Sequence, residues 1–325
     1  MLTTTHAHDY VDTRAQHALG AGSNRALGAG KLAQPLTLTI PAFRRVCLTL
    51  VGCGGTGSHI ASGLAALALA LREQSVACEL TFIDPDTVEP KNVGRQLFGL
   101  ADIGQPKATV LARRLNATLG LNIGAVKRAI DESDNFIEAV PQADTLYLVV
   151  GAVDNPAARA AIAQAVKRAQ GKLWWLDCGN ERVSGQVALG NCADKKQFMG
   201  VAALGLIDRL PAPDVQYPDL VQAPKVKKQK ARSCAELTAD GEQGLMVNRM
   251  AAAWALALLD DFLNRRAVHW FGAAFGLEWG GVTVYTLDAP TLADVVGLTA
   301  RELTCVAKAA SEKRGQTQPV RAGAG

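Results

Sequence analysis

Four glycines in a short stretch are the first residues of this chain whose types and spacing could do chemistry. They follow the order Gly-x-Gly-Gly-x-Gly, at Gly52, Gly54, Gly55 and Gly57. An apolar, β-rich run at 46–51 precedes them and a long Ala- and Leu-rich stretch follows, which predicts a strand, a tight turn and a helix. Free N–H groups at a helix N-terminus bind anions, so the pattern predicts a nucleotide phosphate site.

Each glycine has an expected physical role. We expect Gly52 to permit the turn and Gly57 to allow close packing of the helix. Gly54 and Gly55 should let the backbone approach a phosphate with no Cβ in the way.

Polar and basic residues follow in an order that a dinucleotide site does not require. Residues 79–84 read as the second strand, so Asp84 lies at its carboxyl end, where a carboxylate can bind ribose hydroxyls. Asn92, Arg95 and Lys107 come next. A dinucleotide carries about two phosphate charges and ATP about four, and loss of pyrophosphate concentrates charge on the leaving group. Fixed cations beside the glycine turn therefore favour adenylylation from ATP.

Taken together, these motifs resemble those of the ThiF/MoeB family, which has the fold of the ubiquitin-activating enzymes. The family pattern runs G-x-G-G-x-G, D-x-D-x-V, N-x-x-R-Q, D-I-G-x-x-K and later an Asp-Asn, which this chain has at Asp154-Asn155. The resemblance covers roughly residues 45–290. Among the branches of the family, the long Ala-rich chain resembles the ThiF-like proteins of bacterial plasmid PRTRC systems.

The resemblance implies a role for each motif residue. By position, Gly52, Gly54, Gly55 and Gly57 would contact the nucleotide phosphates, Asp84 the ribose, Asn92, Arg95 and Lys107 the phosphates, and Asp154 a Mg²⁺ ion. Mg²⁺ prefers one or two carboxylates together with phosphate oxygens, which suits a strand-end aspartate beside the glycine turn. The implied reaction is attack by the C-terminal carboxylate of a small ubiquitin-like or sulfur-carrier protein on the α-phosphate of ATP. Its products are an acyl-adenylate and pyrophosphate, with Arg95, Lys107 and Asp154 in catalytic roles.

Ordinary structural explanations exist for several of these residues. Asp86 and Asp102 would also serve as helix or turn caps, as Asp102 before Gly104 suggests. Arg95 and Lys107 would, one at a time, also fit as solvated surface charges. Their order and spacing together favour the site.

The seven cysteines include no Cys-x-x-Cys pair, so we expect reduced thiols and no structural zinc. Cys234 has five basic residues around it, which would lower its thiol pKa. Its position resembles that of the nucleophilic cysteine on the crossover loop of thioester-forming relatives. The alternative, an ordinary small residue before a helix, stays open.

Two departures from the family pattern stand out. Close relatives often have Asp at the position of Gly151, so any role of that carboxylate is absent here. Several relatives also insert an N-terminal arginine into the ATP site of the neighbouring subunit. We expect a homodimer, but no arginine near the start of this chain matches that pattern, so completion of the site by a partner is a hypothesis.

Alternating strand and helix patterns from 46 to 177 predict an α/β fold: a Rossmann-like, doubly wound, mostly parallel sheet with a C-terminal antiparallel extension. We expect a flexible arm over 1–40, an ATP-binding domain over 41–290 and a tail over 291–325. Four prolines and a basic cluster predict an irregular crossover loop at about 208–235.

Composition narrows the setting and the partners. The net charge of +4 is too small to indicate nucleic-acid binding. The longest weakly polar run is too short to cross a bilayer, and the chain does not open on a signal-peptide pattern, so a cytoplasmic protein is expected. A conjugating or deconjugating enzyme is a further expected partner.

Two other functions compete with adenylylation. One is an NAD(P)-dependent oxidoreductase, disfavoured by the basic residues and by the 27 residues from Gly57 to Asp84, against the ~20 typical of dinucleotide folds. The other is a non-catalytic module that binds nucleotide or a partner.

Overall fold

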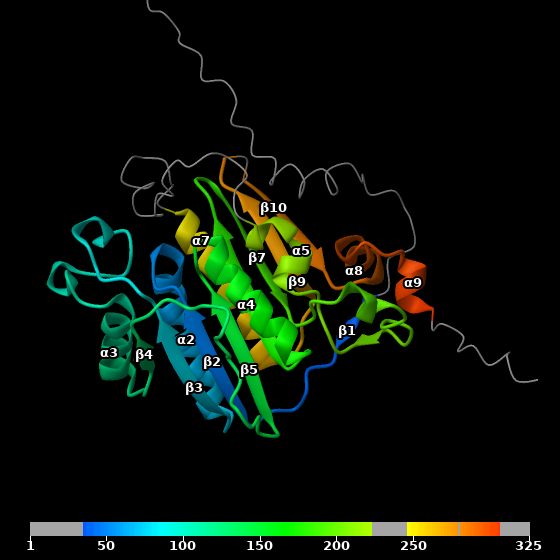
Figure 1. Cartoon of the computed structure of the whole chain (residues 1–325), viewed down its shortest axis with the longest axis horizontal. Helices are drawn as coiled ribbons and strands as arrows, with labels where there is room; N and C mark the ends of the chain where they lie inside the picture. Colours follow the sequence, from blue (N-terminus) through cyan, green and yellow to red (C-terminus); the bar gives the residue numbers. More distant parts are fainter. Residues whose placement is uncertain (1–34, 223–245, 279, 306–325) are drawn as a thin grey trace, which may run out of the picture.

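An eight-stranded sheet with helices on both faces forms the centre of the computed structural model, which describes residues 35–222, 246–278 and 280–305 (Figure 1). The strands lie in the order β10-β9-β7-β6-β5-β2-β3-β4. Their bounds are β2 Arg45–Val51, β3 Ala77–Ile83, β4 Gly124–Val126, β5 Thr145–Gly151, β6 Leu173–Asn180, β7 Ser184–Gly190, β9 Trp270–Gly276 and β10 Gly281–Thr286.

The longer helices follow the strands in alternation. They are α2 Gly55–Glu73, α3 Lys107–Leu119, α4 Pro156–Ala169 and α7 Val247–Asp260, which continues as a π-helical turn over Asp261–Arg265. Shorter elements are the 3₁₀ turns η1 Pro90–Asn92, η2 Leu100–Asp102, η3 Lys195–Phe198 and η4 Pro218–Val221, and the helices α5 Pro213–Gln216, α8 Ala289–Val296 and α9 Ala300–Thr304.

The parallel half of the sheet winds in two directions from β2. The chain passes from β2 through α2 to β3 on one side, and β5 later pairs with β2 in parallel on the other side. Ligands of doubly wound folds bind where the winding reverses, at the carboxyl ends of the strands. The carboxyl ends of β2 and β5 therefore mark the expected site.

The antiparallel extension is confirmed. β7 pairs antiparallel with β6, and β9 and β10 continue the sheet in antiparallel pairs. Together with the parallel strands they form the predicted mixed sheet.

Two apolar layers hold the helices against the sheet. On one face, strand residues such as Leu48 and Leu148 pack beneath α2 and α7; on the other, Val149 and Trp175 pack beneath α4, which lies in front of the sheet in Figure 1. Most of these side chains are Ala, Leu and Val, with Trp174 and Trp175 among the large exceptions.

The packed structure extends beyond the domain boundaries predicted at both ends. Leu36 and Leu38 are buried, and strand β1 (Thr37–Leu38) pairs in parallel with β8 (Leu206–Ile207). At the other end, Leu292 and Leu303 are buried in α8 and α9. Residues 35–40 and 291–305 thus contribute apolar side chains to the core. Residues 1–34 and 306–325 lie outside the described residues.

The predicted crossover loop is only partly described. Up to residue 222 it contains α5 and η4, each beginning with a proline, where the missing N–H costs no helical hydrogen bond. Residues 223–245, which include Cys234 and the basic cluster, lie outside the described residues. None of the helices that the structure describes combines the length and apolar character needed to cross a bilayer.

Candidate nucleotide site

The glycine turn joins β2 to α2 at the point where the winding of the sheet reverses. Gly52 has a φ of +91°, and a Cβ there would lie 2.4 Å from the carbonyl oxygen of Ala152, just after β5. A Cβ on Gly57 would lie 1.9 Å from the carbonyl oxygen of Gly52. Both positions therefore require glycine, for the turn and for close helix packing, as predicted.

The next two glycines differ from each other. Apart from its neighbours along the chain, no described residue has an atom within 4 Å of the position of a Cβ on Gly54, so this side of the turn is open to the described residues. Gly54 is the N-cap of α2, and no side chain of the described residues caps the helix, so its first N–H groups are available to an anion. At Gly55 a Cβ would lie 2.6 Å from Nδ2 of Asn248, so this glycine makes room for α7, and its approach to a phosphate stays a prediction.

Asp84 follows β3 and fixes the glycine turn in place. Its Oδ2 accepts a hydrogen bond of 2.5 Å from the N–H of Cys53, and its Oδ1 accepts one of 2.8 Å from the N–H of Asp86. The side chain is buried, which raises its pKa, while these N–H groups and nearby Lys107 oppose the rise. The ribose contact stays a prediction, and any ribose hydroxyl would share oxygens that already bind the backbone.

Lys107 begins α3 and reaches the same edge of the sheet. Its Nζ lies 2.9 Å from Oδ2 of Asp86, and its N–H donates to the carbonyl oxygen of Asp86. The lysine side chain is 9% exposed and the aspartate side chain 62% exposed. Successive hydrogen bonds and an ion pair therefore connect the glycine turn, through Asp84 and Asp86, to the ammonium group of Lys107. Because this side chain is buried, Lys107 is not a solvated surface charge.

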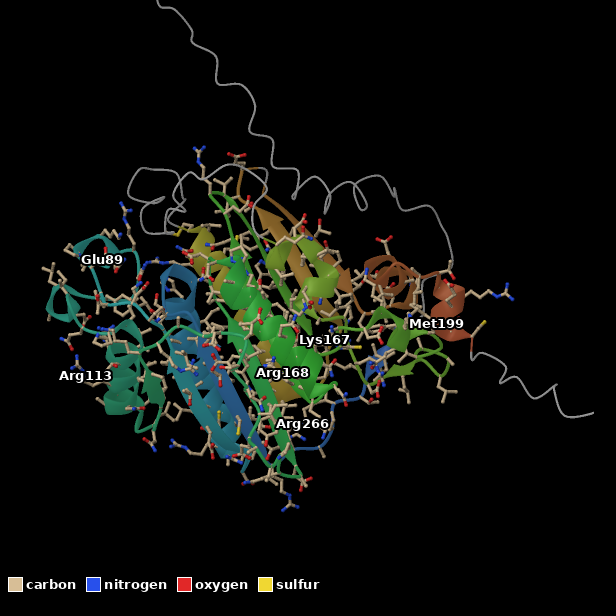
Figure 2. The ribbon with its side chains drawn as sticks, in the orientation of Figure 1. Glu89, Arg113, Lys167, Arg168, Met199 and Arg266 are labelled. Atoms are coloured by element: carbon tan, nitrogen blue, oxygen red, sulfur yellow. The ribbon has the colours of Figure 1, made fainter. Side chains whose placement is uncertain are left out.

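Asn92 and Arg95 lie on the stretch between β3 and α3, which Glu89 marks in Figure 2. Asn92 is buried, and its Oδ1 accepts a hydrogen bond of 2.8 Å from the N–H of Glu89, so it closes η1. Arg95 is half-buried in the following turn. A hydrogen bond from the N–H of Leu97 to Oγ of the buried Ser58 ties this stretch to the first turns of α2. Phosphate contacts for Asn92 and Arg95 remain predictions.

Asp154 lies in the loop that leaves β5 beside the glycine turn. Cγ1 of the preceding Val153 would be 3.1 Å from a Cβ on Gly52. Asp154 itself is exposed, and Asn155 caps α4 by accepting a hydrogen bond from the N–H of Ala158. An exposed carboxylate at this edge has the donor type that Mg²⁺ requires, so the residue fits its predicted role.

A polar cluster that the sequence did not reveal supports the start of α2. Oδ1 of Asn248 on α7 accepts hydrogen bonds from Oγ1 of Thr56, at 3.0 Å, and from Nδ2 of Asn180 at the end of β6. Thr56 and Asn248 are 192 positions apart in the chain. No local pattern could have linked them, because only the packing of α7 against α2 brings them together.

Outside this edge, Cys47, Glu79 and Glu138 place potential metal-ligand atoms within 4.8 Å of one another. The guanidinium of Arg45 ion-pairs with both carboxylates at 2.7 Å and supplies the positive charge itself. Burial raises the pKa of Cys47 to about 11, so its thiol stays protonated. This cluster does not favour a metal ion.

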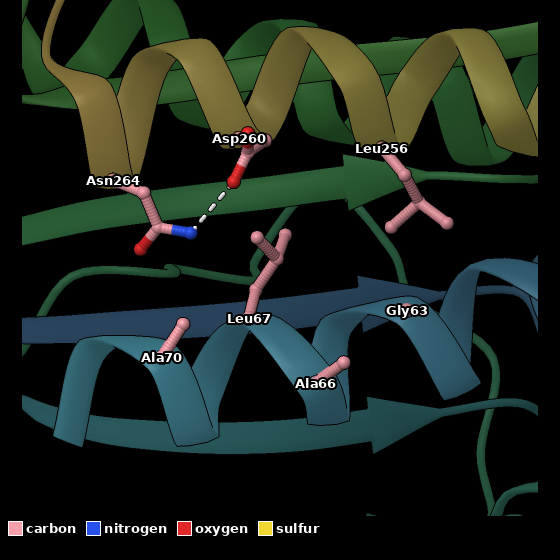
Figure 3. A pocket seen from close by; sticks show the side chains of 7 residues that line it. All are labelled: Gly63, Ala66, Leu67, Ala70, Leu256, Asp260 and Asn264. Carbon is pink, nitrogen blue, oxygen red and sulfur yellow. Dashed lines mark hydrogen bonds between the residues drawn. The ribbon is translucent and has the colours of Figure 1, made fainter. Parts of the chain in front are cut away.

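A groove between α2 and α7 has a volume of about 350 Å³ (Figure 3). It is lined by Gly63, Ala66, Leu67, Ala70, Leu256, Asp260 and Asn264. Its lining carries no cationic side chain, and its charged residue is an aspartate, so it does not suit a triphosphate.

Comparison with known proteins identifies one protein family and several solved structures of low sequence identity. A model described as the ThiF family matches residues 42–309. Among solved structures, the crystal structure of selenomethionine PaaA is 13% identical, with 75% of this chain and 64% of PaaA covered and a TM-score of 0.47. The complex of E. coli MccB with AMPCPP and MccA is 18% identical, with 74% and 64% covered and a TM-score of 0.47.

E. coli MccB alone is 18% identical, with 74% and 62% covered and a TM-score of 0.49. The chain thus spans less than two thirds of the length of each of these proteins. A search of curated proteins found no match.

Proposed function

Because the chain belongs to the ThiF family, we propose that it is an ATP-dependent adenylyltransferase that activates the C-terminal carboxylate of a small ubiquitin-like or sulfur-carrier protein. One observation carries the proposal: the contacts that connect the open glycine turn, through Asp84 and Asp86, to the buried ammonium group of Lys107. A fixed cation beside a phosphate-binding turn serves the loss of pyrophosphate.

The triphosphate would lie against the first N–H groups of α2, with Lys107 and Arg95 against its outer phosphates. Asp154 would hold a Mg²⁺ ion, which when bound would neutralise phosphate charge. An oxygen of the carrier's carboxylate forms a bond to the α-phosphorus as the bond to the bridging oxygen of pyrophosphate breaks, and pyrophosphate leaves. The role of the chain in this step is to position the phosphates and to stabilise the charge on the leaving group.

A second step would involve Cys234, which lies outside the described residues. We propose that its thiolate attacks the acyl-adenylate and releases AMP, so that the carrier becomes a thioester. The basic residues between 225 and 232 would favour the thiolate. We also propose that the protein acts as a homodimer.

The experiment is a pyrophosphate-release assay with ATP, Mg²⁺ and purified carriers that end in Gly-Gly. The wild type should release pyrophosphate, and Lys107→Ala or Asp154→Ala should abolish release. Arg113→Ala, on the exposed face of the same helix as Lys107 (Figure 2), removes one positive charge and should retain activity. Full activity of Lys107→Ala would contradict the proposal.

A carrier bound to Cys234 would be released by a thiol reagent and would be absent in Cys234→Ser. ATP binding without pyrophosphate release for any carrier would favour the non-catalytic module instead.

A further inference from the structure

Arg159 forms an ion pair with a buried carboxylate, one oxygen of which makes no hydrogen bond to a described residue. Nε of Arg159, in the first turn of α4, lies 3.1 Å from Oδ1 of Asp177 on β6. The Asp177 side chain is 1% exposed, and its Oδ2 has no hydrogen-bond partner among the residues that the structure describes. A buried ion pair with one unpaired oxygen contributes little to the stability of the fold, because desolvation of the charges offsets their attraction. The arrangement therefore suits a guanidinium that binds a ligand.

The outer edge of the same guanidinium is unused. Within the described part of the chain, neither Nη1 nor Nη2 of Arg159 donates a hydrogen bond, although the side chain is only 12% exposed. The amide of Gln186, on the neighbouring strand β7, likewise makes no hydrogen bond to a described residue. Two sets of donors are therefore available on this face of the sheet.

Gly179 brings these donors together. It pairs directly with Gln186 across β6 and β7. A Cβ on Gly179 would lie 3.1 Å from Nη2 of Arg159 and 2.5 Å from Nε2 of Gln186. The two side chains thus lie side by side over a backbone without a side chain, and their N–H groups are available to the same ligand.

The position of these donors distinguishes between two anions of the reaction. They lie on the face of the sheet covered by α4, near the carboxyl ends of β5 and β6, whereas the glycine turn opens α2 on the opposite face. Arg159 and Asp177 together carry no net charge, and the buried Asp177 would repel a triphosphate of about four charges far more than it would repel a single carboxylate. A carboxylate also fits the planar fork of an arginine.

We propose that Arg159 and Gln186, over Gly179, bind the C-terminal carboxylate of the acceptor and orient it for attack, with Asp177 as a positioning residue. The inference rests on the proposed function for the identity of the acceptor, and the binding of a peptide carboxylate can be measured without it.

The test uses the full chain labelled with [¹⁵N]arginine and two probes, acetyl-Gly-Gly and its C-terminal amide. The guanidinium signals of Arg159, assigned with Arg159→Lys, should shift saturably with the acid in the millimolar range and not with the amide. Gly179→Ala places a methyl group between the two donors without breaking the ion pair to Asp177, and should weaken binding of the acid about tenfold or more. Gln186→Ala should weaken it as well.

Gly99→Ala is the matched control and should leave binding unchanged, since among the described residues beyond its chain neighbours a Cβ there would meet only Oδ2 of Asp102, at 3.8 Å. Arg159→Ala leaves Asp177 unpaired and is expected to unfold, so Gly179→Ala decides the test. An equal response to acid and amide, or undiminished binding by Gly179→Ala, would overturn the proposal. Displacement of the acid by ATP and Mg²⁺ would assign the donors to a phosphate instead.

In all variants of the donor cluster the affinity for ATP and Mg²⁺, measured separately, should equal that of the wild type. If the wild type did not bind ATP, the proposed function would be contradicted, but the measured binding of acetyl-Gly-Gly would still test the role of Arg159 and Gln186.

Discussion

The ammonium group of Lys107 lies 2.9 Å from the carboxylate of Asp86, with the lysine buried and the aspartate exposed. An ion pair with one exposed partner contributes about 0–1 kcal/mol, whereas a charge-assisted contact with phosphate contributes about 1.5–3 kcal/mol. We therefore expect that Lys107 can exchange Asp86 for a phosphate of the nucleotide at little cost in free energy, and that Asp86 holds the lysine in place in the absence of nucleotide.

This difference predicts unequal effects of the two residues on nucleotide affinity. Lys107→Ala should weaken binding of ATP and Mg²⁺ by roughly 10- to 100-fold, and Asp86→Asn should change it by less than about fivefold. Isothermal titration would measure both, with Arg113→Ala as the control. A larger loss in Asp86→Asn than in Lys107→Ala would show that the aspartate, and not the lysine, binds the ligand.

Gly57→Ala should damage both the fold and the site. Its methyl group would lie 1.9 Å from the backbone carbonyl of Gly52, which cannot move aside as a flexible side chain would. We expect a loss of about 1–3 kcal/mol or more in the free energy of unfolding, together with weaker ATP binding. Urea denaturation measures the first, and Gly99→Ala should be near neutral. Wild-type stability in Gly57→Ala would refute the close packing of the turn.

Asn248→Ala tests the link between α7 and the glycine turn. The substitution leaves Thr56 and Asn180 without the oxygen that both contact, which should cost about 1–3 kcal/mol of unfolding free energy. Asn264→Ala, which removes an asparagine from the π-helical turn after α7, is the control and should cost less. Equal losses in the two variants would remove any special role for Asn248.

The buried Asp177 should leave a signature in the pH dependence of stability. Burial raises its pKa above 3.8, with Arg159 opposing the rise, so the folded state binds the proton more tightly than the unfolded state. The contribution of this carboxyl to stability is then largest below pH 3.8 and falls as pH rises through the higher folded pKa. The stability of the wild type relative to Asp177→Asn, from urea denaturation, should thus decrease across that window. A relative stability that rises with pH would mean that the ion pair lowers the pKa.

Much of this architecture could be predicted because its signals are local. The run at 46–51, the glycines and the strand before Asp84 each specify a conformation through neighbouring residues, so the parallel sheet and its carboxyl edge followed from the sequence. An antiparallel extension on the C-terminal side of the parallel strands was also predicted. The apolar character of Leu36 and Leu292, by contrast, did not show that these residues reach the core, because their partners lie far along the chain.

The missed parts of the site share that cause. The reason for a glycine at position 55 is an asparagine on a distant helix, and the donors over Gly179 combine α4, β6 and β7. Asp84, expected at the ribose, also holds the turn through Cys53, a backbone contact that residue types cannot encode. Cys234 and its basic neighbours were predicted from sequence and lie outside the described residues.

This edge of the sheet should bind a triphosphate and not a dinucleotide. Isothermal titration of the wild type, Lys107→Ala and Arg113→Ala with ATP and Mg²⁺, and with NADH, measures both affinities. ATP should bind to the wild type and to Arg113→Ala, and roughly 10- to 100-fold more weakly to Lys107→Ala, whereas NADH should give no saturable binding. Saturable binding of NADH with no binding of ATP, or equal ATP affinity in all three proteins, would contradict this prediction.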